Sequence, residues 1–173
     1  MKTIWQRLVW VLAIAGANIG LDQWTKVWAR EHLANQPARS YWNDFFRLVY
    51  VENRGAFLSM GSTLGEGLRY WVLHIFPVAL LAGLTLYTVL GKQLNRWQLI
   101  GMSFIIGGGV SNIYDRLLYG QVTDFMNMGL FGLRTGIFNF ADVSIMVGLV
   151  MLLPFAFGGT KKAEPTPAST EEE

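Results

Sequence analysis

Two aspartates stand at positions where a carboxylate is costly to keep. Asp124 lies in the run Gln-Val-Thr-Asp-Phe, and Asp142 ends the run Phe-Asn-Phe-Ala-Asp at the head of an apolar stretch. A carboxylate at the edge of hydrocarbon is unfavourable, so it is a candidate functional group. Two close carboxylates share a proton, which lets one accept a proton from water while the other donates one to a carbonyl oxygen. This pair therefore has the residue types for hydrolysis of an amide bond.

A structural interpretation of the same two aspartates stays open. Asp142 could be an acid that the dipole favours at the start of a helix, and Asp124 could cap a loop. Their separation along the chain says nothing about the distance between the carboxylates. If Asp142 begins the last apolar segment, Asp124 lies in the loop before it. We therefore expect both side chains at a similar depth.

Other polar residues interrupt the apolar segments at helical spacing. Asn112 and Arg116 are four residues apart and can share a helix face, with Asp115 next to Arg116. They could hold substrate backbone and orient the carboxylates, or they could belong to a structural ion pair. Asp22 and Lys26 are also four residues apart. They form either an intramembrane ion pair or part of a proton path, and charged residues within spans are usually paired.

Two asparagines and a glycine extend the candidate site. Asn53 and Gly55 follow a strand-like run, where Gly55 suits a turn and Asn53 could instead place its amide in the site. Asn139 precedes the last apolar segment, where it could cap a helix or contact the aspartates.

We expect no metal and no cofactor. His32 and His74 are isolated in the sequence and are poor candidates for ligands. Carboxylates of Asp115, Asp124 and Asp142 would suit Mg²⁺ or Ca²⁺, but nothing in their spacing requires a cation.

The composition is that of a membrane protein. Of the 173 residues, 52% are hydrophobic and 15% are charged, and the mean hydropathy is +0.32. The seven Trp, six Tyr and eleven Phe suit aromatic belts at the membrane surfaces. The chain has no Cys, which excludes disulfides and thiolate chemistry. The net charge is +2 with scattered basic residues, so there is no nucleic-acid patch.

We expect one domain over residues 1–162 with four membrane-spanning helices, since a span needs about 20 mostly apolar residues. Pro77 predicts a kink in the second span, and the glycines at 107–109 predict close packing of the third. The expected spans cover residues 8–28, 68–90, 97–113 and 140–157.

The segments between the spans predict the rest of the fold. Residues 41–57 and 131–138 are rich in aromatic and β-branched residues and predict short strands. Residues 163–173 predict a disordered tail. Basic residues cluster at the start of the chain, between the second and third spans, and after the fourth. By the positive-inside rule both chain ends are cytoplasmic, and both aspartates face the extracytoplasmic side.

Five short motifs together resemble the lipoprotein signal peptidases, the type II signal peptidases of bacterial inner membranes. Each motif is weak alone, but their order is specific. The resemblance spans all four expected helices and both outer segments, which is roughly the whole chain except the tail. In order they are Asp22 and Lys26; Asn53, Gly55 and Ala56; Gly107, Gly108, Asn112, Asp115 and Arg116; Val122, Asp124 and Phe125; and Phe138, Asn139, Ala141 and Asp142.

The resemblance implies an aspartic membrane endopeptidase with Asp124 and Asp142 as its catalytic dyad. Its substrate would be a prolipoprotein, cut before a cysteine that carries a diacylglyceryl group, and globomycin-type cyclic peptides would inhibit it. It would lie in the bacterial inner membrane, in contact with membrane lipid, with its active site facing the periplasm. The implied fold is an all-α membrane protein, a four-helix bundle with a small extracytoplasmic β-cradle and a periplasmic loop segment. Supporting positions would be Asp22, Lys26, Asn53, Gly55, Asn112, Asp115, Arg116 and Asn139.

The sequence departs from the family pattern at two places. Ser111 stands where a glycine is usual, and Phe57-Leu58 follows Gly55-Ala56 where a second Ala and then Phe are common. These departures predict a changed substrate preference rather than changed chemistry. Two alternatives come from other classes. One is a small transporter or proton-coupled carrier, which the absence of acids across the apolar core disfavours; the other is an assembly factor in which both aspartates are caps.

Overall fold

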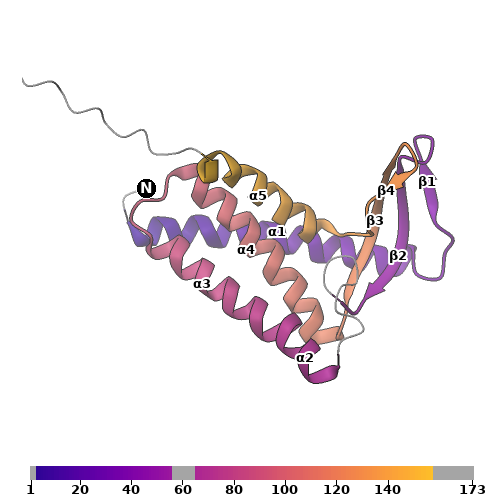
Figure 1. Ribbon diagram of the computed structural model, residues 1–173, viewed down its shortest axis with the longest axis horizontal. Helices are drawn as coiled ribbons and strands as arrows, with labels where there is room; N and C mark the ends of the chain where they lie inside the picture. Colours follow the sequence, from indigo (N-terminus) through magenta and orange to yellow (C-terminus); the bar gives the residue numbers. More distant parts are fainter. Residues whose placement is uncertain (1–2, 56–64, 158–173) are drawn as a thin grey trace, which may run out of the picture.

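Long helices lie side by side in this protein, and a small sheet lies across one end of them (Figure 1). The computed structural model describes residues 3–55 and 65–157. The long helices are α1 (Ile4–His32), α3 (Phe76–Leu90), α4 (Arg96–Tyr119) and α5 (Phe140–Phe157). A short helix α2 (Glu66–Tyr70) and a π-helical segment η2 (Trp71–Ile75) lead directly into α3.

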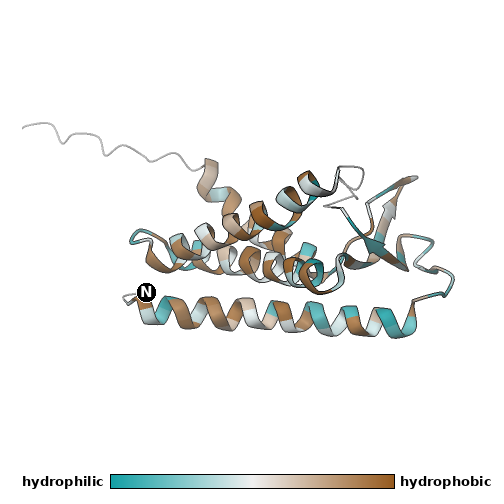
Figure 2. Ribbon diagram, turned by 90° about the horizontal axis from the view of Figure 1, so that it is seen from below, coloured by the Kyte–Doolittle hydropathy of each residue, from teal (hydrophilic) through white to brown (hydrophobic). Residues whose placement is uncertain are grey.

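Three helical segments of the described chain are long and apolar enough to cross a membrane: Ile4–His32, Gly67–Leu90 and Phe140–Phe157. Figure 2 shows hydrophobic positions, in brown, along the helices, and many of the large apolar side chains on them are exposed. Trp5 is 76% exposed and Trp24 is 67% exposed, for example. Large apolar groups on the outside and polar groups inside are what a bilayer solvent favours, because lipid replaces water around the bundle.

Helix α4 is the long helix that is not among these three segments. It packs against α1, α3 and α5. It begins with a capping box, in which Asn95 and Gln98 each accept a hydrogen bond from the other's main-chain N–H. Its glycines allow close approach, as the sequence predicted: a Cβ at Gly107 would lie 2.9 Å from the Cα of Ala15 on α1. A Cβ at Gly108 would overlap the carbonyl oxygen of Ala141 on α5.

Helix α1 (Ile4–His32) extends four residues beyond the expected first span, 8–28, at each end. Helix α5 covers residues 140–157 as expected. Helix α4 continues to Tyr119, six residues beyond the expected end of the third span at 113. Asn112, Asp115 and Arg116 therefore lie inside a helix and do not close it. At Pro77, where a kink was expected, the structure has the wider π-helical turn η2 just before. Proline removes one helical hydrogen bond and clashes with the preceding turn, and a π turn relieves that clash.

The sheet is antiparallel with strand order β1-β2-β3-β4. Strands β1 (Arg39–Tyr41) and β2 (Phe46–Asn53) lie within or beside the expected strand region 41–57. In the region 131–138, strand β4 (Leu133–Arg134) is short, and Phe138 forms an isolated bridge with Met126.

Strand β3 (Val122–Leu130) was not predicted, and the expectation that Asp124 lies in a loop was wrong. The reason is that residues 122–127 are all buried, so the strand lacks the alternation of apolar and polar residues that marks a half-exposed strand.

Two apolar clusters hold the helices and the sheet together. One lies between helices and contains Val11, Ala15, Leu99 and Ile106. The other joins the C-terminal end of α1 to β3 through Ala29, Leu33, Phe125 and Met126. The second cluster fixes the sheet against the helix ends, where the candidate site lies. Ala56, the Phe57-Leu58 departure, Lys161, Lys162 and the predicted tail at 163–173 lie outside the described residues.

Candidate active site

A bulge in the sheet sets the direction of Asp124. The pairing of β2 with β3 shifts register between Leu48 and Val51, and the main-chain N–H groups of Phe125 and Met126 both donate to the carbonyl oxygen of Phe138. Phe125 and Met126 therefore both face the apolar cluster. Asp124 lies on the opposite face, where it lines a groove. Bulges beside active sites commonly redirect a side chain in this way.

Asp124 is buried, with 3% of its surface exposed. Its Oδ2 accepts a hydrogen bond from Asn53 Nδ2 at 2.9 Å, and its Oδ1 accepts one from Asn139 Nδ2 at 2.6 Å. Asn53 stands at the end of β2, and its own Oδ1 accepts from the main-chain N–H of Gly55 at 2.9 Å. The turn at Gly55 thus orients the Asn53 amide that binds the Asp124 carboxylate. Both interpretations of this segment, the turn at Gly55 and the Asn53 amide in the site, are therefore present together.

Asp142 lies in the first turn of α5 and takes part in the helix cap. Its Oδ2 accepts from the main-chain N–H of Asn139 at 3.2 Å, and its own N–H donates to Asn139 Oδ1 at 3.0 Å. These reciprocal bonds form a capping box in which aspartate replaces the usual glutamate. The other oxygen, Oδ1, accepts from Asn112 Nδ2 at 2.9 Å. The capping interpretation of Asp142 is thus correct, and the same carboxylate also faces the candidate site.

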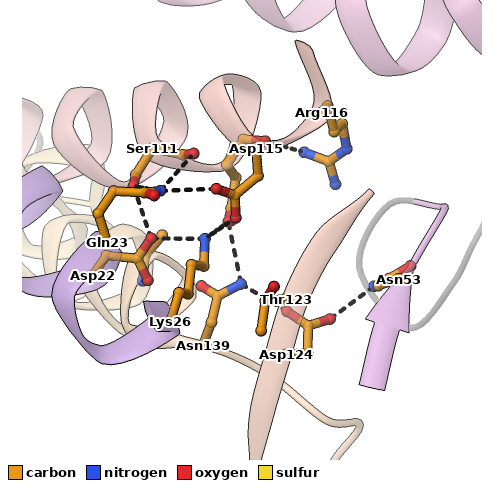
Figure 3. Close-up of polar contacts among 12 residues, drawn as sticks. Asp22, Gln23, Lys26, Asn53, Ser111, Asp115, Arg116, Thr123, Asp124 and Asn139 are labelled. Atoms are coloured by element: carbon orange, nitrogen blue, oxygen red, sulfur yellow. Dashed lines mark hydrogen bonds and ion pairs between the residues drawn. The ribbon is translucent and has the colours of Figure 1, made fainter. Parts of the chain in front are cut away.

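Asn139 connects the two aspartates. Its side-chain Nδ2 donates to Asp124 and, at 3.1 Å, to Asn112 Oδ1, while its main-chain N–H donates to Asp142. Asn139 is fully buried. One residue therefore holds a carboxylate of the sheet and a carboxylate of α5 in the same network. Figure 3 shows Asn139 beside Asp124.

The environment of Asp124 makes its carboxyl group easier to protonate than an ordinary aspartate. Burial raises the pKa of Asp124 from 3.8 to about 6, and the negative charge of Asp142 adds to the rise. The hydrogen bonds from Asn53 and Asn139 act in the opposite direction because they stabilise the carboxylate. The charge of Asp142 therefore couples protonation of Asp124 to the state of its neighbour.

A buried ion cluster supports the network from the helix side. Lys26 Nζ lies 2.7 Å from Asp22 Oδ2 and 2.7 Å from Asp115 Oδ2, and it donates to Asn112 Oδ1 at 2.9 Å. Asp22, Lys26 and Asp115 have no exposed surface. Asp22 Oδ1 also accepts from the main-chain N–H of Ala141 at 2.8 Å, which ties α1 to the first turn of α5. The cluster thus orients Asn112 and the helix start that carries Asp142.

Two further polar residues in this cluster were not predicted as site residues. Gln23 Nε2 donates to Ser111 Oγ at 2.9 Å and to Asp115 Oδ1 at 2.9 Å, and Ser111 Oγ donates to Asp22 Oδ2 at 2.7 Å (Figure 3). Ser111, which stands where a glycine is usual, therefore adds a donor to a buried carboxylate. Gln23 does not share the four-residue spacing of Asp22 and Lys26, so no helical pattern in the sequence singled it out.

Arg116 lies beside both aspartates and contacts the turn after β2. Its Nη2 donates to the carbonyl oxygen of Gly55 at 3.0 Å, and its Nη1 donates to the carbonyl oxygen of Asn112 at 3.4 Å. Arg116 lines a small pocket together with Asp124 and Asp142. The free volume of this pocket is about 10 Å³, which is close to the space that one water molecule needs.

A larger groove of about 480 Å³ opens on the other side of Asp124, along the face of the sheet. Its lining combines apolar side chains, such as Val51 and Ile137, with polar ones, and Arg47 and Arg134 also line it. Both arginines form ion pairs with Asp44. Arg134 Nη1 lies 3.0 Å from Asp44 Oδ2, and Arg47 Nε donates to Asp44 Oδ1 at 2.5 Å. The lining residues include Arg47, Val49, Val51, Asn53, Asp124, Asn127, Arg134 and Ile137.

The carboxylates that were considered for a metal site are not gathered into one. Asp115 binds Lys26, and Asn112 lies between Lys26 and Asp142. Within residues 3–55 and 65–157, no group of three His, Cys, Asp or Glu side chains has the geometry to hold a metal ion.

Comparison with known proteins shows to which family the chain belongs. A family model described as "Signal peptidase (SPase) II" matches residues 14–157. The chain belongs to the signal peptidase II family. A lipoprotein signal peptidase of Gloeobacter violaceus is 35% identical over 167 residues, which cover 96% of this chain and 88% of the relative. A lipoprotein signal peptidase of a Cyanothece species is 37% identical over 155 residues, which cover 86% of each chain.

Solved structures of bacterial membrane enzymes have the same fold. One has a TM-score of 0.75 and 25% identity, and the match covers 87% of this chain and 94% of that enzyme. Another has a TM-score of 0.72 and 23% identity, and the match covers 90% of this chain and 94% of that enzyme. Membership of the signal peptidase II family confirms the resemblance stated from the motifs. The comparisons give the transporter interpretation no support.

All of the predicted site residues of this signal peptidase lie in one connected region. Asp124, Asp142, Asn53, Asn112 and Asn139 are joined directly by hydrogen bonds. Asp22, Lys26 and Asp115 lie behind Asn112, and Arg116 and Gly55 close the side toward the turn after β2. The Asp124 carboxylate comes from strand β3 and the Asp142 carboxylate from helix α5. The sequence alone did not predict that this strand and this helix place them side by side.

Proposed function

We propose that Asp124 and Asp142 form the catalytic dyad of this signal peptidase. The chain is an aspartic-type signal peptidase of a bacterial membrane that removes signal peptides from prolipoproteins. The observation that supports the dyad is the bridge through Asn139, which binds both carboxylates beside a pocket of the size of one water molecule. Each carboxylate accepts two hydrogen bonds, and all four donors belong to asparagines. Because asparagine is neutral, these donors add no positive charge that would keep both carboxylates ionised.

Hydrolysis proceeds with the pair singly protonated. The ionised carboxylate takes a proton from a water molecule, whose oxygen attacks the carbonyl carbon of the scissile bond. The protonated carboxyl group donates its proton to the carbonyl oxygen, which gives a neutral tetrahedral diol. The diol then loses a proton to a carboxylate, its C–N bond breaks, and the leaving nitrogen takes a proton from the other carboxyl group. The dyad ends with one proton, as it began.

The substrate in this proposal is a prolipoprotein cut before a cysteine that carries a diacylglyceryl group. The groove of about 480 Å³ that begins at Asp124 has room for an extended peptide segment. Its apolar lining and its position at the end of the helices suit a chain that leaves the membrane at this level. The pocket between the carboxylates lies at the start of α5, so a lipidated residue held in the bilayer can reach it.

Four spans with both chain ends in the cytoplasm complete the proposal. Helix α4 has 24 residues and lies among three helices that can cross a membrane. Its glycines and buried polar residues face those neighbours, so it needs less apolar surface than a lipid-exposed helix. With α4 as the third of four spans, the dyad faces the periplasm. We also expect inhibition by globomycin-type cyclic peptides, which would compete for the same groove.

Cleavage of a diacylglyceryl-modified prolipoprotein in detergent tests the dyad. Asp124→Asn and Asp142→Asn should each abolish cleavage, and Glu31→Gln, at an exposed acid near the end of α1, should leave it unchanged. Full activity in either Asn variant would overturn the proposed roles. Cleavage of the unmodified precursor at the same rate would overturn the proposed substrate and leave the dyad standing.

A further inference from the structure

A second pocket adjoins the candidate active site and shares Arg116 with it. It has a volume of about 290 Å³ and lies between the α2–η2 segment and the C-terminal end of α4. Arg54, Arg69, Tyr70, His74 and Arg116 are among its described lining residues. None of the described lining residues is Asp or Glu, so the pocket gathers three positive charges from separate segments of the chain.

Among the described residues no ion pair is formed by Arg54 or Arg69, and Arg116 forms none either, although the charges of Asp142, Asp124 and Asp115 act on it. Arg54 Nε donates to the neutral Gln121 Oε1 at 3.2 Å, and Arg116 donates only to main-chain carbonyl oxygens. Elsewhere on the described chain, Arg47 and Arg134 are both paired with Asp44. Arg54 and Arg69 line the same cavity and repel each other, and an anion in the cavity would remove that repulsion.

Two buried nitrogens at the pocket have no hydrogen-bond partner within the described residues. They are Nε of Arg116 and Nδ1 of His74. His74 stacks on Tyr70, with the ring centroids 4.9 Å apart, so its ring is held in place at the pocket wall. Buried polar groups without a partner are rare in native structures and call for a ligand or a water molecule. Oxygen atoms of a bound oxyanion would satisfy both nitrogens.

The aromatic residues around the pocket place it at the level of lipid headgroups. Tyr70 is 53% exposed, Trp71 is 64% exposed and Tyr119 is 54% exposed. Exposed Tyr and Trp mark the membrane–water interface. The candidate span Gly67–Leu90 begins at the same place, with Arg69 as its third residue.

We propose that this pocket binds the phosphate group of an anionic phospholipid. Arginine suits phosphate because its planar fork of donors matches the oxyanion geometry, and basic pockets between membrane helices bind anionic headgroups. The position within an aromatic belt favours a lipid phosphate over a free phosphate in solution. A bound lipid would hold Arg116 from the side opposite to the dyad. The proposal does not depend on catalysis, so it can fail while the dyad assignment holds.

Competition between lipids tests the site in the full chain. Native mass spectrometry of the detergent-purified protein, with equal amounts of phosphatidylglycerol and phosphatidylcholine added, measures the ratio of the two bound lipids. The wild-type protein should retain phosphatidylglycerol preferentially. The double variant Arg54→Gln, Arg69→Gln should lose this preference by about 10-fold to 30-fold, because each arginine near an anionic lipid contributes on the order of a factor of five. Arg116 is left unchanged because it also lines the dyad pocket.

A second pair of arginines controls for total charge. The double variant Arg39→Gln, Arg96→Gln removes the same two charges from the sheet and from the start of α4, and it should keep the wild-type preference. Equal losses in both double variants would overturn the site. Displacement of phosphatidylglycerol by an equal concentration of glycerol phosphate would overturn the lipid source. If the first double variant does not fold, the single change at the exposed Arg54 carries the test, with an expected loss of about fivefold.

Discussion

Asn139 and Asp142 hydrogen-bond each other in both directions at the start of α5. The helix cap and the candidate active site are thus built from the same atoms. A cap usually contributes about 1 kcal/mol to stability and nothing to chemistry. Here the side-chain amide of the cap residue also donates to Asp124, so the cap sets the relative position of the two carboxylates.

Replacing Asp142 by Asn should separate chemistry from capping. An Asn side chain at 142 can still accept the N–H of Asn139, so the free energy of unfolding should change by less than about 1 kcal/mol. Cleavage should fall by at least about 10³-fold, because an amide neither accepts nor donates the catalytic proton. Thermal unfolding in detergent and single-turnover cleavage measure the two effects. A stable variant with more than a tenth of wild-type activity would contradict the catalytic role.

Replacing Asn139 by Ser should keep the cap and remove the bridge. Serine is a good helix N-cap, so α5 should remain capped. The Nδ2 donor to Asp124 is lost, and since that hydrogen bond favours the carboxylate, the pKa of Asp124 should rise further. We expect a cleavage rate about 10-fold to 100-fold lower, because a hydrogen bond to a charged group contributes about 1.5–3 kcal/mol, and a pH–rate profile shifted to higher pH. A rate loss with an unshifted profile would show that Asn139 only caps the helix.

Replacing Asp124 by Asn should stabilise the protein at neutral pH. The folded-state pKa of about 6 lies above the ordinary 3.8, so the folded state holds this proton more tightly than the unfolded state does. The stability contribution of the proton is complete below pH 4 and is lost as the pH rises to about 6. Asp124→Asn should therefore raise the free energy of unfolding by about 2–3 kcal/mol at pH 7.5. The gain should vanish near pH 4, and a gain independent of pH would contradict this explanation.

Replacing Lys26 by Met should damage the fold more than the chemistry. It leaves the carboxylates of Asp22 and Asp115 buried without a cation, which costs about 3–5 kcal/mol. The double variant Lys26→Met, Asp115→Asn removes one of the stranded charges and should regain part of the loss. Thermal unfolding of the single and double variants measures the coupling. Equal unfolding midpoints for the two variants would show that the ion cluster is not coupled.

Replacing Gly108 by Ala should move α5 and with it Asp142. The added methyl group would overlap the carbonyl oxygen of Ala141, next to Asp142. We expect a loss of about 1–3 kcal/mol in stability from overpacking and a lower cleavage rate. Gly83→Ala on α3 is the matched control, since its Cβ would meet nothing within 4 Å. Wild-type activity in the Gly108 variant would show that the α4–α5 contact does not position the carboxylate.

The motifs named every residue whose side chain holds the two carboxylates. Asp124, Asp142, Asn53, Asn112 and Asn139 are recognisable because they are polar residues beside apolar segments and because their order matches a known family. The apolar segments also predicted the membrane class and the start and end of α5, since the 3.6-residue helix and the bilayer thickness constrain length and composition directly.

The sequence did not predict the strand that carries Asp124. Strand β3 is buried at residues 122–127, so its pattern does not alternate, and its bulge at Phe125 and Met126 exists only through pairing with Phe138. The extension of α4 to Tyr119 was missed because its polar residues are held by distant segments: Asp115 by Lys26 on α1, and Arg116 by the turn after β2.

What the sequence by itself determined is the set of polar residues and the helices that carry most of them. What only the tertiary structure decided is that Asn139 joins Asp124 to Asp142, that Lys26 is shared by two carboxylates, and that Arg116 lies between two pockets. The most distant of these pairs, Lys26 and Asp115, lies 115 − 26 = 89 positions apart in the chain. Residues so distant meet only through helix packing and strand pairing, which no local pattern in the chain encodes.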